Sequence, residues 1–388
     1  MAVQTLFQEY FKTSSTISTR APGRVNLMGA HVDYNDGPVI PAAIDRAVYL
    51  SGAADAENTV TLYAHDLEAQ ITFQLDTLES KTDINGDPLP EWALYPAGVA
   101  WSLQKAGLDV LGLKAVYTSD VPVGAGLSSS AAVEVVFAVT WGALGGWEID
   151  SMRLAQLCQR AENEYVGVAS GLMDQFASIH GVEDHALYFD TRDLTWEPVP
   201  LPTETALVIA DSGVRRSLTT SAYNERRASC EQAVELLKEY MPEIRSLRNV
   251  SPVEFAAFGD FLPPVVRHRA EHVVKEIARV QSALAALRSN NTQSFGALMF
   301  SGHASSRDLY EASCPELDAL VEIAHAAPGC IGARLTGAGF GGCTVNLVEE
   351  SKTSEFIDTL VERYHEKTGR ETDVYLCRAS AGASVEKV

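Results

Sequence analysis

The spacing of apolar and polar residues along the chain predicts a mixture of strands and helices. Short apolar blocks between glycines and prolines are typical of strands, and longer blocks with apolar residues every three or four positions are typical of helices. The first half contains most of the expected strands, over residues 15–20, 24–28, 39–50, 59–63, 71–74, 114–118 and 187–189. A turn at residues 21–23 separates the first two. The helices expected there cover residues 2–13, 92–105, 131–144 and 151–165.

The second half has mainly helical spacing. Helices are expected over residues 219–240, 266–287, 292–309 and 316–325, and strands over residues 207–211, 331–336 and 343–347. A chain of 388 residues is long for a single core. Because a proline-rich segment at residues 198–202 separates the strand-rich half from the helix-rich half, we expect two domains, residues 1–198 and residues 199–388, in an α/β (α+β) fold.

Composition narrows the class of protein. The chain has 30 Lys and Arg against 51 Asp and Glu, a net charge of −21, which argues against nucleic-acid binding but leaves room for a small anionic ligand. It has no apolar run of 18 residues or more and no recognisable export signal. The six cysteines show no C-x-x-C spacing, as expected for reduced thiols. We therefore expect a soluble cytoplasmic protein that does not bind membranes.

The segment Pro-Val-Gly-Ala-Gly-Leu-Ser-Ser-Ser-Ala-Ala, residues 122–132, has the character of a phosphate-binding loop. Its glycines allow a tight turn, and its serines stand where the next helix begins. Free N–H groups and hydroxyls at a helix N-terminus bind anions. No Gly-Lys-Ser/Thr follows, so this is not the familiar P-loop. A plain glycine turn with a serine cap is the alternative.

A second glycine-rich segment lies far away, at residues 332–342. Its five glycines require either a close backbone approach or several positive φ angles. On its own it also fits a glycine-rich hairpin. Together with the serine-rich loop, it is a candidate for the opposite wall of one cleft.

Polar residues gather in residues 23–35, where Arg24, His31 and Asp33 stand among glycines. His31 and Asp33 lack a third nearby ligand, which argues against a metal pair. Carboxylates that accept hydroxyl protons, with a histidine able to donate or accept, suit a sugar site.

Acidic residues form another group. Glu162 stands near the end of an expected helix, and Asp174 follows a glycine bend. They could hold Mg²⁺ and orient a hydroxyl, although surface acids are the alternative. Asp174 lies among apolar residues, so it needs a partner, for which Arg24 is the candidate.

Three of these segments resemble, in order, the signatures of the galactokinase branch of the GHMP superfamily, which phosphorylates galactose, homoserine, mevalonate and phosphomevalonate. They are residues 23–34, 122–132 and 335–342. The likeness covers nearly the whole chain, because further galactokinase-like stretches occur at residues 91–95, 171–175, 221–227 and 313–318. The resemblance implies two domains with the active site in the cleft between them, and a left-handed β-α-β unit in the first.

The resemblance also implies roles for individual residues. Asp174 matches the catalytic aspartate, with Arg24 beside it, and Ser130 and Glu162 match the Mg²⁺ ligands. The positions that match sugar-binding residues are Ala30, His31, Asp33, Gly171 and Tyr223. The positions that match ATP-binding residues are Trp92, Pro122, Gly124, Gly126, Leu127, Ser128, Ser129, Ser130, Gly337 and Gly339.

The implied reaction is attack of a sugar's anomeric hydroxyl on the γ-phosphorus of ATP. Catalysis then consists mostly of positioning and charge stabilisation. Asp174 would accept the hydroxyl proton, but an arginine beside an aspartate makes it a weaker base. Whether Asp174 abstracts the proton or orients the hydroxyl stays open.

One position departs from the family pattern. Galactokinases carry Glu where this chain has Ala30, and by resemblance that Glu binds the hydroxyl at C6. Its loss costs a charge-assisted hydrogen bond, about 1.5–3 kcal/mol. A C6 carboxylate would be repelled by Glu and tolerated by Ala, and plant galacturonate kinases are similar here. Galacturonate is therefore the favoured substrate.

Several alternatives remain open. The substrate could instead be galactose, or L-arabinose, which lacks C6. A non-catalytic sugar sensor is a further alternative, although the serine loop and Asp174 are both intact. A monomer or weak homo-oligomer is expected.

Overall fold

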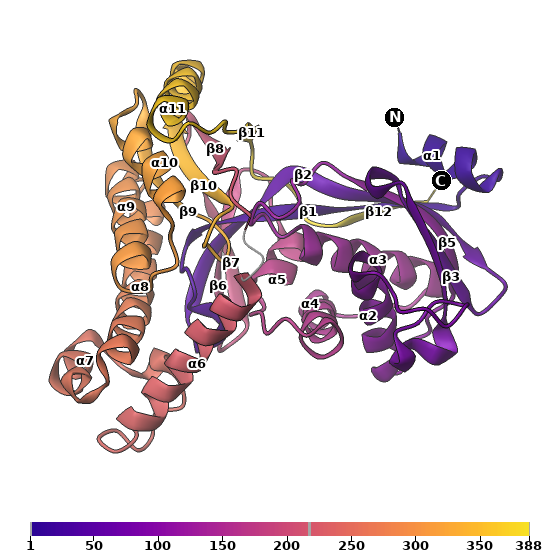
Figure 1. Ribbon diagram of the computed structural model, residues 1–388, viewed down its shortest axis with the longest axis horizontal. Helices are drawn as coiled ribbons and strands as arrows, with labels where there is room; N and C mark the ends of the chain where they lie inside the picture. Colours follow the sequence, from indigo (N-terminus) through magenta and orange to yellow (C-terminus); the bar gives the residue numbers. More distant parts are fainter. Residues whose placement is uncertain (1, 216–218, 388) are drawn as a thin grey trace.

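The structure is a computed structural model, and it describes residues 2–215 and 219–387 (Figure 1). Its larger sheet has eight strands, with the order β12-β1-β2-β5-β3-β4; β6 pairs with β2, and β7 pairs with β6. These strands are β1 (Ile17–Met28), β2 (Pro38–Asp55), β3 (Thr59–Ala64), β4 (Ala69–Gln74), β5 (Gly112–Ser119), β6 (His185–Asp190), β7 (Thr195–Pro200) and β12 (Ser384–Lys387). The predicted strand-rich first half is thereby confirmed.

Four helices of the first half, α2 to α5, gather beneath β1 and β2 in Figure 1, whereas α1 lies apart from them and packs on β5 and β2. Helix α3, which is apolar on nearly all sides, packs against both β1 and β2. The helices of this half are α1 (Val3–Phe11), α2 (Glu91–Lys105), α3 (Ser129–Gly145), α4 (Ser151–Arg160) and α5 (Met173–His180). Strands β3 and β5 form the one parallel pair among the described strands, and α2 lies in the connection between them.

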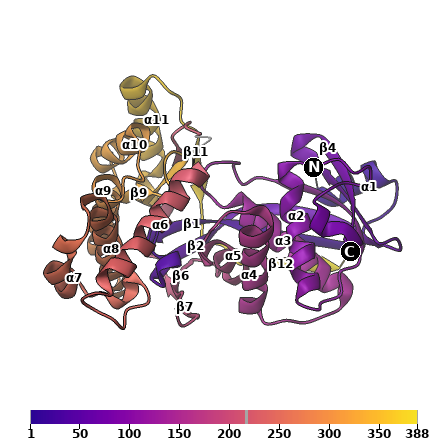
Figure 2. The same ribbon diagram turned by 60° about the horizontal axis from the view of Figure 1, so that its bottom comes forward.

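A second sheet, ordered β11-β8-β10-β9, belongs to the second half. Its strands are β8 (Thr205–Asp211), β9 (Cys330–Leu335), β10 (Cys343–Glu349) and β11 (Val374–Cys377). Helices pack on it and beside it: α6 (Thr219–Leu237), α7 (Pro252–Phe258), α8 (Pro264–Arg288), α9 (Thr292–Asp308), α10 (Pro315–Ala326) and α11 (Thr353–Thr368). Figure 2 shows these helices on one side and α2–α5 on the other, with β1 and β2 running between them.

The expected turn at residues 21–23 is wrong, because β1 continues through it. Ala21 and Pro22 pair with β2, and at this point the register merely shifts, between Pro22 and Arg24. Gly23 is required by packing instead: a Cβ there would lie 2.8 Å from the carbonyl oxygen of Leu127. The strand therefore touches the serine-rich loop at this point.

The chain's last described residues return to the first sheet. β12 pairs antiparallel with β1, with Ile17 opposite Lys387. The division of the chain at residue 198 stays a prediction, and so does the handedness of the β-α-β unit. The expected helix over residues 151–165 ends as α4 at Arg160 and continues as a π-helical turn over Ala161–Val166.

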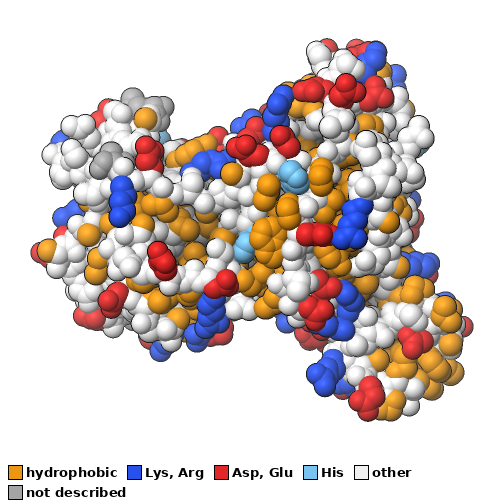
Figure 3. Space-filling model, turned by 180° about the vertical axis from the view of Figure 1, so that it is seen from behind, with side chains coloured by type: hydrophobic (Ala, Val, Ile, Leu, Met, Phe, Trp, Pro, Cys, Tyr) orange, Lys and Arg blue, Asp and Glu red, His pale blue; other side chains and the backbone are white. Residues whose placement is uncertain are grey.

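The surface is mixed in charge. On the face shown in Figure 3, Lys and Arg side chains are scattered among Asp and Glu, without a continuous basic patch. Within the two described ranges, no helix has the length and apolar character that a membrane crossing requires.

Close packing of α9 on β9 leads to a stability prediction. A Cβ on Gly296 would lie 1.9 Å from the carbonyl oxygen of Ile331, so Gly296→Ala must push the helix away from the strand. We expect a loss of about 1–3 kcal/mol in the free energy of unfolding, measured by urea denaturation. Glycine-to-alanine changes inside helices normally raise stability, so a loss of stability would itself point to the close contact between α9 and β9. Ser301→Ala, on the exposed face of the same helix, should change stability by less than about 0.5 kcal/mol.

Candidate active site

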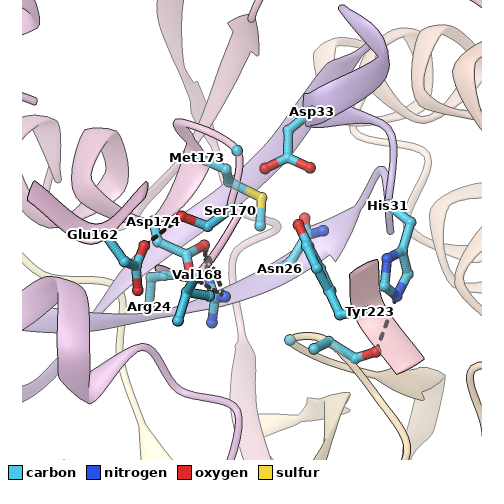
Figure 4. Close-up of a pocket in the computed structure, with 13 residues that line it drawn as sticks. Arg24, Asn26, His31, Asp33, Glu162, Val168, Ser170, Met173, Asp174 and Tyr223 are labelled. Atoms are coloured by element: carbon cyan, nitrogen blue, oxygen red, sulfur yellow. Dashed lines mark hydrogen bonds and ion pairs between the residues drawn. The ribbon is translucent and has the colours of Figure 1, made fainter. Parts of the chain in front are cut away.

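A cavity lies where β1, α5 and the segments from the second half meet (Figure 4). Both halves of the chain contribute to its wall, as expected for a site in an interdomain cleft. The residues that line it are Arg24, Asn26, His31, Asp33, Glu162, Val168, Ser170, Gly171, Met173, Asp174, Tyr223, Gly337 and Ala338.

An ion pair between Arg24 and Asp174 stands at one end of the cavity. Arg24 donates from Nε to Asp174 Oδ1 and from Nη2 to Oδ2, both at 2.8 Å. Its remaining Nη1 donates to the carbonyl oxygen of Gly126 at 2.8 Å, and Ser128 Oγ donates to Asp174 Oδ2 at 2.5 Å. Asp174 also stands in the first turn of α5, where a helix favours negative charge. The prediction that Arg24 is the partner of Asp174 is thereby confirmed, and these contacts hold the carboxylate in one orientation.

The serine-rich loop leads directly into α3. Gly124 and Gly126 adopt positive φ angles of 68° and 76°. Ser128 precedes the helix, but its hydroxyl is given to Asp174, and no side chain in the described ranges caps α3. The amides of the first turn therefore remain available to an anion.

The two glycine-rich segments meet in space. A Cβ on Gly337 would lie 2.5 Å from the carbonyl oxygen of Gly126, so the two backbones are in direct contact. Gly339 lies close to Ala312 in the same way. The second segment therefore stands opposite the serine-rich loop, as its glycines led us to expect.

Glu162 occupies the π-helical turn behind Asp174. Its carboxylate accepts from Ser130 Oγ at 3.3 Å, from Gln175 Nε2 at 2.9 Å and from Ser170 Oγ. Burial, together with the charge of Asp174, raises the pKa of Glu162.

A second buried carboxyl, Glu134, was missed in the sequence. It lies on α3, fully buried, and accepts from Gln175 Nε2 at 2.8 Å, so one amide bridges Glu134 and Glu162. Burial and the charge of Glu162 raise the pKa of Glu134 well above its usual value. The sequence does contain a clue to this buried carboxyl, because Glu134 is the one acid in the otherwise apolar run of residues 131–139.

His31 is locked in place by protein atoms. Its Nε2 lies 2.9 Å from the carbonyl oxygen of Ala338, which can only accept, so Nε2 carries the proton. Nδ1 then accepts from the hydroxyl of Tyr34 at 2.8 Å. Burial lowers the pKa of His31 to about 3, and the imidazole is neutral. Its ring stacks at a tilt near Tyr223, with centroids 5.4 Å apart, at the edge of the cavity.

Asp33 and Gly171 form a tight contact. A Cβ on Gly171 would lie 1.9 Å from Asp33 Oδ2, so only glycine fits. Burial, with a further contribution from the charge of Asp174, raises the pKa of Asp33 to about 6. A hydroxyl donor from a ligand would stabilise its charged form.

Ala30 adjoins the cavity, next to the lining residue His31, but does not itself line it. It is buried. Glu276 Oε1 accepts from the backbone N–H groups of Gly29 at 2.9 Å and Ala30 at 3.2 Å, and also from Arg334 at 2.9 Å. Burial alone would raise the pKa of Glu276, but Arg334 and Arg279 hold it well below its usual value. The loop that carries position 30 is therefore fixed by α8.

The nucleotide side of the site lies next to this cavity. None of the predicted ATP-binding residues 122–130 lines it, but Ser128 and Ser130 reach its walls through Asp174 and Glu162. Trp92 packs near Tyr117, with ring centroids 6.2 Å apart, and its place beside an adenine stays a prediction.

Arg215 is a cation near the serine-rich loop that no motif in the sequence indicates. It is paired with Asp211, and its Nε donates to the carbonyl oxygen of Val123 at 3.4 Å. A Cβ on Gly124 would lie 3.0 Å from its Nε. Arg215 therefore stands beside the serine-rich loop.

Comparison with known families identifies three segments. Residues 5–54 match the galactokinase galactose-binding signature, residues 95–182 match the GHMP kinases N terminal domain, and residues 283–366 match the GHMP kinases C terminal family. The chain is 46% identical over 376 residues to the galactokinase of Roseiflexus sp. (strain RS-1), covering 97% of this chain and 94% of the relative.

The chain belongs to the galactokinase family of GHMP kinases. It is thus a sugar kinase, a phosphotransferase with the two-domain GHMP kinase fold. The galactokinase of Halalkalibacterium halodurans is 38% identical, over 98% of this chain and 96% of the relative.

Solved structures agree with this membership. The crystal structure of Lactococcus lactis galactokinase complexed with galactose superimposes with a TM-score of 0.93, at 34% identity and 98% coverage of both chains. A mevalonate kinase structure, at 20% identity over 93% of this chain and 98% of that chain, matches with a TM-score of 0.64, which shows the shared fold.

The pKa of Asp33 predicts a pH-dependent cost in this galactokinase-family site. Because folding raises that pKa from 3.8 to about 6, the charged carboxylate destabilises the fold above pH 6, and the cost disappears as the pH falls towards 4. We expect Asp33→Asn to stabilise the ligand-free protein by on the order of 2 kcal/mol at pH 8.

The measurement is the thermal midpoint by calorimetry between pH 5 and 8. The gain should shrink as the pH falls. Asp358→Asn, at an exposed position on α11, should show no such trend. A constant gain at every pH would contradict the assignment.

Proposed function

We propose that this protein transfers the γ-phosphoryl group of ATP to the anomeric (C1) hydroxyl of galactose, which yields galactose 1-phosphate and ADP. The observation that carries the proposal is the oriented Asp174 carboxylate. It faces a cavity with Asp33 and Tyr223 and is bonded to Ser128 at the start of an uncapped helix. One carboxylate thus stands between a sugar-sized site and an anion-binding loop.

The residues of the serine-rich loop fit a nucleotide. The α3 amides and the positive-φ glycines suit phosphate oxygens, and Arg215 adds a cation at the same loop. Trp92, Gly337 and Gly339 complete the proposed ATP-binding set.

The oxygens of Ser130 and Glu162 fit Mg²⁺. Within the described residues, no group of three or more His, Cys, Asp or Glu is arranged to hold a metal ion by itself. Magnesium commonly uses one or two protein oxygens together with substrate phosphates, so the pair suffices. When bound, the ion neutralises negative charge on the phosphates.

Asp174 positions the attacking hydroxyl. Its two oxygens already accept three hydrogen bonds from Arg24 and Ser128, and a carboxylate has room for about one more. That remaining site can accept from the anomeric O–H. Because Arg24 and Ser128 fix the carboxylate in one orientation, we infer that Asp174 aligns and polarises the hydroxyl during phosphoryl transfer.

A neutral sugar suits the charges of the cavity. Its acidic and basic lining consists of Arg24, Asp33, Glu162 and Asp174, besides the neutral His31, and Arg24 is already paired. A C6 carboxylate would add negative charge to a site with three acids. The expected preference for galacturonate is therefore unsupported, while the relatives named galactokinase favour galactose. The alanine at position 30 is the one feature that points the other way, towards galacturonate or a sugar without C6.

Asp174→Asn tests the catalytic assignment. We expect turnover to fall by roughly 10²–10⁴-fold, because the amide cannot hold the hydroxyl or pair with Arg24 in the same way. The dissociation constant for Mg-ATP, measured by calorimetry, should stay close to that of the wild type. Asp184→Asn, at an exposed position, serves as the control. Full turnover in Asp174→Asn would remove the role.

A sugar panel tests the substrate. ADP release should be fastest with galactose, and slower with galacturonate and L-arabinose. Ala30→Glu should raise the preference for galactose about ten-fold or more, since a charge-assisted hydrogen bond to C6 is restored. An unchanged ratio would show that position 30 does not read C6. Sugar binding without ADP release would favour the sensor alternative instead.

A further inference from the structure

Asn26 is a polar residue of the cavity wall that the roles above leave unused. It lies on β1, two residues after Arg24, and both residues pair with β2 in one continuous register. Residues at i and i+2 of a strand point to the same face, so Asn26 shares the cavity side of the strand with Arg24. Figure 4 shows it between Arg24 and Tyr223.

The side chain of Asn26 has an unsatisfied group. Only 4% of the residue is exposed, and no described residue donates to its buried Oδ1. Among the described residues that line the cavity, it is the only one with such an atom. A buried acceptor without a donor costs free energy, and native proteins retain few of them.

Neighbouring donors are directed elsewhere. Each nitrogen of the Arg24 guanidinium is bonded to Asp174 or Gly126, and the Nε2 proton of His31 goes to the carbonyl oxygen of Ala338. The backbone of Asn26 is held as well, because its N–H donates to Thr336 Oγ1 at 2.8 Å. The backbone therefore fixes the carboxamide at the cavity wall, where its Oδ1 is free to accept a hydrogen bond from a ligand.

We propose that the carboxamide of Asn26 binds a hydroxyl group of the sugar, which makes Asn26 a further substrate-binding residue. This inference rests on the proposed function. An orphaned acceptor needs a donor, and a sugar hydroxyl donates and accepts, as a carboxamide does. Ionised phosphate oxygens only accept, and the phosphate-binding loop lies outside this cavity. The sugar is therefore the ligand that satisfies Asn26.

The first test is Asn26→Ala. We expect the KM for galactose to rise about ten-fold or more, with the dissociation constant for Mg-ATP within two-fold of the wild type. The thermal midpoint of the ligand-free protein should not fall, because the change removes an unsatisfied buried group. A residue that served only the fold would lower that midpoint.

Asn346 provides a matched control. It is a fully buried asparagine on β10 whose Oδ1 also lacks a donor among the described residues, but its Nδ2 donates to the carbonyl oxygen of Val208 at 2.8 Å. It does not line the cavity. Asn346→Ala should lower the thermal midpoint and leave the KM for galactose unchanged.

A series of 2-, 3-, 4- and 6-deoxygalactose then identifies the hydroxyl. The Asn26→Ala penalty should vanish for the one analogue that lacks the partner hydroxyl and persist for the others. An equal penalty across the series, an unchanged KM for galactose, or an effect on Mg-ATP alone would each overturn the proposal.

Sugar binding by calorimetry separates this inference from the proposed function. If the wild type binds galactose but releases no ADP, the kinase proposal fails while the Asn26 penalty can still be measured as a binding constant. If the wild type turns over galactose and Asn26→Ala matches it, only the Asn26 proposal fails. A wild type that binds no sugar of the series would overturn both.

Discussion

The ion pair between Arg24 and Asp174 is the interaction on which the arrangement of the site depends. The guanidinium of Arg24 holds both carboxylate oxygens and, with its third nitrogen, the carbonyl of Gly126 in the phosphate-binding loop. Ser128, at the start of α3, completes the link. One buried cation thus sets the distance between the sugar cavity and the loop that faces the nucleotide. Removing either partner of such a pair leaves a buried charge uncompensated, which is strongly unfavourable.

Close backbone contacts are a second constraint on the site. Gly23 lets β1 touch the serine-rich loop, and Gly337 lets the second glycine segment touch Gly126. Gly171 leaves space for the carboxylate of Asp33. A side chain at any of these positions would force apart segments that must lie together. The positions of the polar groups around the cavity are therefore set by rigid backbone contacts.

Local patterns predicted much of the fold, but not the elements whose signal is weak. Long apolar blocks located β2, α3, α8 and α9 within a few residues of their observed ends. The last strand, β12, was missed because its four residues are exposed and show no apolar alternation; only pairing with β1 makes it a strand. Helix α5 was also missed, because eight residues are too few to show a clear helical repeat of apolar positions. Helix α11 was not predicted either, although the sequence contains a helical pattern there: Phe356, Leu360 and Tyr364 recur every four residues and are buried.

For the site, the sequence by itself determined the order of the motifs and the types of chemical group they bring: glycine turns, serines before a helix, and a few acids near Arg24. It even identified Arg24 as the partner of Asp174, because a carboxylate among apolar residues needs one. Only the tertiary structure decided which groups are already satisfied and which are free. It shows Ala30 outside the cavity lining, His31 bonded through both nitrogens, Glu134 joined to Glu162 through Gln175, and Asn26 Oδ1 without a donor among the described residues. The physical reason is that a motif sets the identity of a group locally, whereas many of its hydrogen-bond partners come from segments tens to hundreds of residues away, which the packing of the whole chain brings close.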